Sequence, residues 1–128
     1  MIVLDTSALM ALLLDEPEAD QIADRLKSEE EFTISAGTLA EALIVAGRRG
    51  ISTEMSQLIE GIAVEIENLS AAGAIAVAEA YSVWGKGIHP AGLNFGDCFS
   101  YVTAKGCGSP LLYVGDDFSQ TDIRSAVS

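Results

Sequence analysis

The sequence has few of the residues on which many small enzymes and metal-binding proteins depend. Its 128 residues include two cysteines and one histidine. Cys98 and Cys107 have no zinc-type spacing, and on one helix they would point to opposite sides, so we expect neither a metal finger nor a disulfide. Two reduced thiols are typical of a reducing compartment. The sequence also has no Ser-His-Asp arrangement, phosphate-binding loop or dinucleotide-binding glycine motif.

Long apolar runs are absent as well. The longest run, from Ala8 to Leu14, is far shorter than the ~20 residues that cross a membrane. The amino end has no basic segment and begins as a strand, so we expect no signal peptide, no membrane association and a cytoplasmic location. Hydrophobic residues make up 49% and charged residues 20%, which predicts a folded chain, and the length fits one compact domain over residues 1–128.

Positive charge is scarce. Seven lysines and arginines against 19 acidic residues give a net charge of −12. Such a field is poor at attracting nucleic acid, and this is the main objection to a role on RNA or DNA. A divalent cation held by clustered carboxylates, or a basic partner protein, would offset the charge locally. The alternative explanation is that the acidic surface keeps the protein soluble.

Apolar periodicity predicts strands that alternate with helices. The strands are expected at residues 2–4, 32–34, 64–69 and 110–114. Helices are expected at residues 6–14, 54–62 and 95–106, with two more from Pro17 to residue 26 and from Ser35 or Thr38 to residue 49. A further helix is expected after a cap at Ser70, and its apolar stripe is Ala74, Val77, Ala78 and Tyr81. This alternation predicts an α/β fold, a three-layer α/β/α sandwich with a mostly parallel central sheet.

Acidic residues fall where the expected strands end or the expected helices begin. Asp5 follows the first strand, and the pair Asp116 and Asp117 follows the last strand. Glu41 and Asp97 are expected in the first turns of two helices. Because ligands bind outside the carboxyl ends of the strands in such sheets, and helix amino ends meet the same edge, we expect these acids to lie together.

Each acid alone also has a structural explanation. Asp5 and Asp97 lie where a helix N-terminus favours an anion. Glu41 completes a capping box that starts at Thr38, and residues 116–117 suit a turn. As a set, however, the carboxylates repel one another unless a cation is present. Hard oxygen ligands suit Mg²⁺ or Mn²⁺, which can activate water and neutralise charge on a phosphate.

Some basic and aromatic side chains are candidates for substrate contact. Lys86 and His89 lie in a loop rich in glycine and proline at residues 84–92. A small basic rim for a phosphate backbone would add Arg48, Arg49 and Lys105. Ordinary solvated charges explain the arginines at least as well. Tyr81 and Trp84, at helical spacing, are expected in the core.

Four stretches, in order along nearly the whole chain, resemble the VapC family of PIN-domain toxins. They are residues 1–9, 35–50, 85–99 and 111–123. The resemblance implies a flavodoxin-like sandwich and hydrolysis of RNA phosphodiesters with Mg²⁺ or Mn²⁺, as the toxin of a type II toxin–antitoxin pair. It also implies a homodimer and a VapB-like antitoxin whose tail places a basic side chain in the acidic pocket.

The resemblance also implies residue roles by motif position. Asp5 and Asp97 would be the principal metal ligands, and Glu41 would complete the catalytic pocket. Asp117 fits the fourth acidic position better than Asp116. A water made more acidic by the cation would attack phosphorus in line, with Glu41 or Asp117 orienting or deprotonating it.

The hydroxyl of Thr6 or Ser7 would lie near the metal or the phosphate. Two other functions use the same scaffold. One is a non-catalytic protein-interaction module, whose acids serve as helix caps or bind a cation-rich tail. The other is a metal-dependent phosphatase or DNA nuclease with the same pocket.

Overall fold

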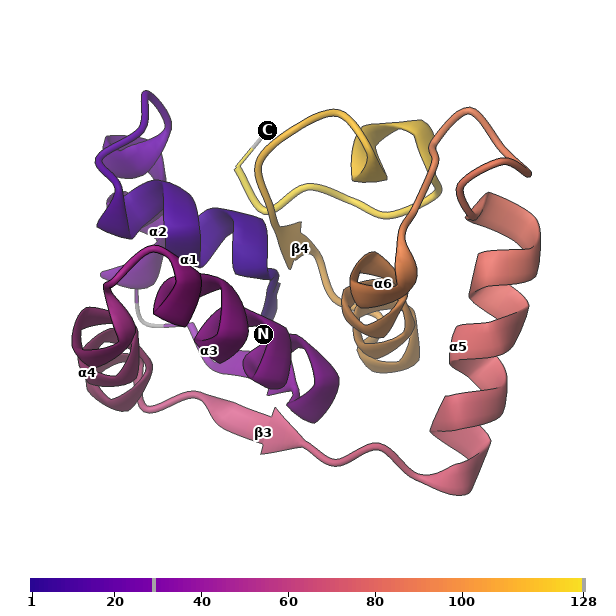
Figure 1. The fold of residues 1–128 in the computed structure, drawn as a ribbon, viewed down its shortest axis with the longest axis horizontal. Coiled ribbons are helices and arrows are strands. Elements are labelled where there is room, and N and C mark those ends of the chain that lie inside the picture. The colour runs from indigo at the N-terminus through magenta and orange to yellow at the C-terminus, as the bar shows by residue number, and fades with distance from the viewer. Residues whose placement is uncertain (29, 128) are drawn as a thin grey trace.

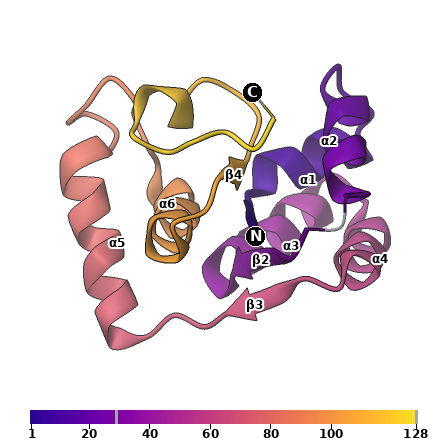
Figure 2. The same cartoon turned by 180° about the vertical axis from the view of Figure 1, so that it is seen from behind.

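Four short parallel strands form one sheet in the computed structural model, which describes residues 1–28 and 30–127. The strands are β1 (Ile2–Leu4), β2 (Phe32–Ser35), β3 (Glu65–Glu67) and β4 (Leu111–Leu112). Their order across the sheet is β3-β2-β1-β4, and each pairing is parallel. Figure 1 and Figure 2 show the molecule from the front and from behind, with the strands between two groups of helices. The predicted parallel sheet is confirmed.

Helices connect the strands and cover both faces of the sheet. They are α1 (Thr6–Leu13), α2 (Ala19–Leu26), α3 (Ala36–Arg48), α4 (Ser52–Ile62), α5 (Ala71–Trp84) and α6 (Phe95–Cys107), followed by the short 3₁₀-helix η1 (Phe118–Gln120). In Figure 1, α5 and α6 lie on one side of the molecule and α1 to α4 on the other. No helix within the described ranges is long and apolar enough to cross a membrane.

The strands contribute side chains to two apolar cores, because successive side chains of a strand point to opposite faces of the sheet. Ile2 and Leu4 pack with Ile34 and with residues of α1, α3 and α4. Val3 and Leu111 pack with residues of α5 and α6 on the other face. Helices therefore bury both sides of the sheet, as the predicted three-layer sandwich requires.

The two edges of the sheet differ. At one edge, the tail pairs with β4: Leu111 donates its N–H to the Arg124 carbonyl at 2.9 Å, and Ala126 donates to the Leu111 carbonyl at 3.0 Å. At the other edge, β3 pairs with β2 on its inner side, and all three of its residues are exposed. β3 is shorter than the predicted strand at 64–69, because only this part pairs with β2.

Several predicted helix details are wrong. Pro17 lies in a turn before α2, closed by the Ala19 N–H on the Glu16 carbonyl at 2.9 Å. Ser35 caps α3, so Glu41 lies in the second turn of that helix and forms no capping box with Thr38. The two cysteines are both on α6 and both free, as expected.

The predicted apolar stripe of α5 is also wrong. Val77 is buried, but Ala74 and Ala78 are exposed, and Tyr81 is 38% exposed rather than in the core. Ala80, which is not part of the predicted stripe, is buried instead. The helix is apolar around most of its circumference, so its sequence did not specify the buried face.

Candidate active site

Asp5 is the most deeply buried acid of the candidate site, with 3% of its surface exposed. It follows β1 directly and caps α1. Its Oδ2 accepts hydrogen bonds from the Ser7 N–H at 3.0 Å and the Ser7 hydroxyl at 2.6 Å. Its Oδ1 accepts one from the Ser100 hydroxyl at 2.5 Å. These bonds offset the cost of burying a carboxylate and fix its orientation.

Ser7 also connects Asp5 to the neighbouring strand. Its Oγ accepts the Val114 N–H at 3.0 Å, just after β4. Because β1 and β4 are parallel and paired, the carboxyl ends of both strands meet here. The predicted convergence of the segments that follow the first and last strands is therefore present in the structure.

Glu41 extends from α3 toward the amino end of α6. A Cβ atom built on Gly96 would collide with the Glu41 carboxylate, so only a glycine allows this approach. Burial raises the pKa of Glu41, the hydroxyl of Thr6 lowers it through a hydrogen bond, and the charge of Asp5 raises it further. The predicted proximity of Glu41 to Asp5 is thus present, although Glu41 lies in the second turn of its helix.

Asp97 lies in the first turn of α6 and completes a capping box with Asn94. The Asn94 N–H donates to Asp97 Oδ2 at 3.0 Å, and the Asp97 N–H donates to Asn94 Oδ1 at 2.9 Å. Burial raises the pKa of Asp97 to about 7, and the charges of Asp5, Asp117 and Glu41 contribute to this rise. The structural explanation for Asp97 is therefore correct, and the residue also belongs to an acidic cluster.

Asp117 and Asp116 lie at the exposed rim of this cluster. Asp117 precedes η1, and its charge is among those that raise the pKa of Asp97. The backbone carbonyl of Asp116 accepts the Ser119 hydroxyl at 2.6 Å. The interaction with Asp97 favours Asp117 as the fourth acid, in line with the sequence-based preference.

The acidic cluster offers the oxygen donors that a hard divalent cation prefers. Among the residues that the structure describes, no three Asp, Glu, His or Cys side chains are placed so that they could hold one metal ion together. Burial is the largest cause of the raised pKa values of Glu41 and Asp97, and the charges of neighbouring acids add to it, so a bound cation would relieve part of the rise. The residues therefore fit Mg²⁺ or Mn²⁺ by donor chemistry and charge.

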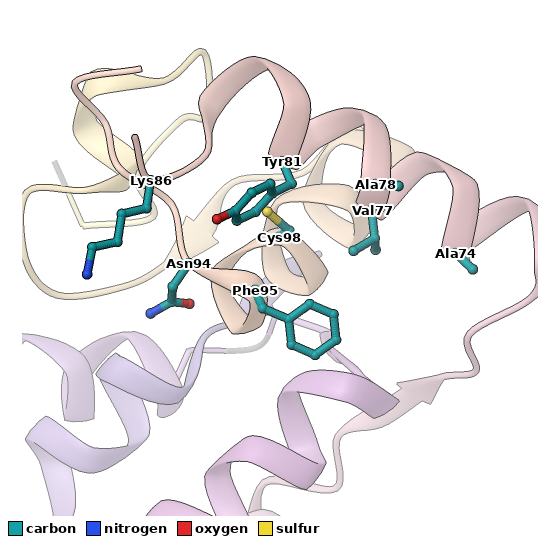
Figure 3. Close-up of a pocket in the computed structure, with 8 residues that line it drawn as sticks. All are labelled: Ala74, Val77, Ala78, Tyr81, Lys86, Asn94, Phe95 and Cys98. Atoms are coloured by element: carbon teal, nitrogen blue, oxygen red, sulfur yellow. The ribbon is translucent and has the colours of Figure 1, made fainter. Parts of the chain in front are cut away.

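The loop cations are outside the cluster. Lys86 lines a cavity of about 480 Å³ between α5 and α6, and Figure 3 shows it near Asn94, with its side chain directed away from Phe95. His89 is held by its own loop, because its Nδ1 accepts the Ala91 N–H at 2.9 Å and its ring packs edge-on against Trp84. Lys86 is thus near the first turn of α6, whereas His89 has a structural role.

Arg48 and Phe95 lie near the acids on a second side. They line a cavity of about 400 Å³ between α3 and α6, together with Glu41. Phe95 is 67% exposed and stacks edge-on against Phe99, with the ring centres 4.9 Å apart. The pocket is therefore flanked by apolar surface and by one cation on each side, Lys86 and Arg48.

Thr38 and Ser100 lie next to the acids of the site, although no sequence pattern indicates a role there for either of them. Ser100 contacts Asp5, and its Oγ lies 3.0 Å from the Thr38 Oγ1. Thr38 and Ser100 are 62 positions apart in the chain, and Asp5 and Ser100 are 95 positions apart. Such pairs have no local signal in the sequence.

The fold and the clustered carboxylates define an α/β protein with an acidic pocket at the carboxyl edge of a parallel sheet. The family model named PIN domain matches residues 2–124. Ribonuclease VapC30 of Mycobacterium tuberculosis is 42% identical over 126 residues, covering 96% of each chain. Ribonuclease VapC of Mycolicibacterium smegmatis is 39% identical over 126 residues, covering 96% of this chain and 98% of that protein. The chain therefore belongs to the PIN-domain family and, within it, to the VapC ribonucleases.

Solved structures share the fold. The Sarcin-Ricin loop cleaving toxin VapC20 of Mycobacterium tuberculosis superposes with a TM-score of 0.81 at 16% identity, with all of both chains covered. A toxin–antitoxin complex from Klebsiella pneumoniae gives a TM-score of 0.72 at 19% identity and covers 95% of this chain and 93% of that one. At these identities, the likeness concerns the architecture alone.

Proposed function

We propose that this protein is a metal-dependent endoribonuclease that hydrolyses RNA phosphodiester bonds, and that it is the toxin of a VapBC toxin–antitoxin pair. The observation that carries the proposal is the gathering of acids from the ends of β1 and β4 and from α3 and α6, whose charges help to raise the pKa of Asp97 to about 7. The names of its VapC relatives support ribonuclease activity. An RNA substrate also implies action in the cytoplasm.

Asp5 and Asp97 are the proposed ligands of Mg²⁺ or Mn²⁺, with Glu41 and Asp117 completing the acidic pocket. When bound, the cation lowers the pKa of water and neutralises charge on the phosphate. Each of these carboxylates is on a different element, and their side chains would have to move closer together to share an ion. The buried hydrogen bonds of Asp5 support its role as the fixed ligand.

The chain's own side chains would divide the remaining tasks. Glu41, whose pKa is raised by burial, accepts a proton from the attacking water, and Asp117 at the rim orients that water. The Thr6 hydroxyl lowers the pKa of Glu41, and the Ser7 hydroxyl donates a hydrogen bond to Asp5. Lys86, beside the first turn of α6, is placed to contact a backbone phosphate.

A basic antitoxin would suit the charge of this protein. The net charge of −12 opposes binding of RNA but favours a partner that inserts a basic side chain into the acidic pocket. Exposed apolar residues around the pocket, such as Phe95 and Ile44, would be covered by this partner or by the second copy in a homodimer. The same acidity favours the alternative function, a non-catalytic interaction module.

RNA cleavage by the purified, antitoxin-free protein tests the proposal. We expect cleavage with Mn²⁺, loss of cleavage in EDTA, and a loss of at least about a hundredfold in Asp5→Asn and Asp97→Asn. Asp117→Asn should reduce cleavage strongly, whereas Asp116→Asn, its exposed neighbour, is the matched control. Single-stranded DNA and a small phosphate ester should remain uncleaved. Cleavage that persists in excess EDTA would contradict a metal-dependent site, and absence of cleavage with tight partner binding would favour the interaction module.

A further inference from the structure

Two buried hydroxyl groups lie directly behind the acidic pocket. Ser100 and Thr38 are both fully buried, and their oxygens are 3.0 Å apart. Ser100 Oγ is also 2.5 Å from Asp5 Oδ1. Because an ionised carboxylate only accepts hydrogen bonds, Ser100 donates to Asp5, and its oxygen is left to accept from Thr38. The three groups thus form a directional chain, Thr38 to Ser100 to Asp5.

The helical register places this chain one turn away from the other acids. Ser100 follows Asp97 by three residues on α6, and Thr38 precedes Glu41 by three residues on α3. Side chains three residues apart lie on the same face of a helix. The bond between the two hydroxyls therefore joins α3 to α6 just below their carboxylates and continues to Asp5 at the end of β1. Three of the four acid-bearing elements, β1, α3 and α6, thus meet in one hydrogen-bonded chain.

The hydrogen bonds also limit how Asp5 can bind a ligand. A carboxylate has about four lone-pair sites. Ser7 takes two of them on Oδ2, through its N–H and its hydroxyl, and Ser100 takes one on Oδ1. The remaining site is on Oδ1, the oxygen that Ser100 holds. Ser100 thereby sets the direction in which Asp5 can offer its free lone pair.

We propose that Ser100, supported by Thr38, is a positioning residue that orients Asp5 and fixes the spacing of α3 and α6 for binding of a divalent cation. This inference rests on the proposed function for its metal. Groups that orient metal ligands in this way typically change metal affinity by roughly ten- to a hundredfold when removed. Buried hydroxyl pairs also act as a unit, because each bond strengthens the next.

Calorimetric titration of the purified protein with Mn²⁺ tests the proposal. Ser100→Ala and Thr38→Val remove one hydroxyl each, and Thr38→Ser restores the hydroxyl without the methyl group. Thr103→Val is the matched control, because Thr103 is also buried on α6 but its hydroxyl contacts Glu67 at 3.3 Å, away from Asp5. We expect Ser100→Ala to weaken Mn²⁺ binding at least about tenfold, Thr38→Val by less, and Thr38→Ser and Thr103→Val by less than twofold.

Unfolding in urea with EDTA tests the hydroxyl chain independently of the metal. If Thr38 acts through Ser100, the double variant Ser100→Ala/Thr38→Val should lower the unfolding midpoint by less than the two single variants together. Unchanged Mn²⁺ affinity in Ser100→Ala, or an equal loss in Thr103→Val, would overturn the proposal. If the wild-type protein binds no Mn²⁺, the proposed function fails and the positioning role fails with it; non-additive midpoints would then show only that Thr38 and Ser100 act as one structural pair.

Discussion

Replacing Asp97 by asparagine is expected to stabilise the metal-free protein above pH 7 and to leave its stability nearly unchanged near pH 4. Burial and the neighbouring acids raise the pKa of Asp97 from an ordinary 3.8 to about 7 in the folded state. The folded protein therefore binds a proton at Asp97 more tightly than the unfolded chain does. Its stability falls as the pH rises from about 4 to about 7 and is constant above that range.

The size of this effect follows from the two pKa values. Such a rise corresponds to at most about 4 kcal/mol of lost stability above pH 7, at about 1.36 kcal/mol for each pKa unit. Asp97 is only partly buried, so solvent screening reduces this to about 1–2 kcal/mol. Asparagine keeps a side-chain oxygen that can accept the Asn94 N–H, so the capping bond survives the substitution.

Urea unfolding followed by circular dichroism at pH 4, 5.5, 7 and 8, in EDTA, measures the effect. We expect Asp97→Asn to gain about 1–2 kcal/mol over the wild type at pH 8 and to lose this gain progressively down to pH 4. Asp116→Asn, at an exposed position nearby, serves as the control and should show a much smaller change with pH. If the difference in unfolding free energy between Asp97→Asn and the wild type is the same at all four pH values, the raised pKa of Asp97 is refuted.

Two further substitutions test other contacts. Gly96→Ala should reduce RNA cleavage at least about tenfold while the protein stays folded, because the new Cβ would displace the Glu41 carboxylate. Full activity of this variant would show that Glu41 is not needed where the structure places it. Tyr101→Phe should lower the free energy of unfolding by about 1 kcal/mol, because Trp84 Nε1 loses the acceptor that it now contacts at 3.0 Å. RNA cleavage should be unchanged. Unfolding curves that coincide with those of the wild type would rule out this contribution to stability.

The sequence predicted the parts of the fold that have strong local patterns. The strands at Ile2–Leu4 and Phe32–Ser35 were predicted because short segments rich in apolar and β-branched residues alternate with helical patterns, which favours a parallel sheet. The proximity of Asp5, Asp97 and Asp117 was predicted because each follows a strand or lies in the first turn of a helix, which places it at one edge of the sheet. Their roles in binding metal and RNA remain predictions.

The missed features depend on contacts between distant segments. α5 is rich in alanine and apolar on several sides, so periodicity could not show that Val77 is buried and Tyr81 exposed. Glu41 was assigned to a first turn because both Ser35 and Thr38 are good capping residues, and only the structure shows that Ser35 is the cap. Thr38 is instead committed to Ser100 on another helix, a pairing that no local pattern predicts.

The unequal edges of the sheet bear on how this protein avoids aggregation by the pairing of sheet edges. The tail shields β4, so β3 is the lateral edge at which another chain's backbone could extend the sheet. That strand carries Glu65 and Glu67 on either side of Ile66, all exposed. A second copy approaching in register would bring like charges together over unsatisfied amide groups, which disfavours fibre-like growth. The acidity of the chain thus also guards the point where its architecture is most open to aggregation.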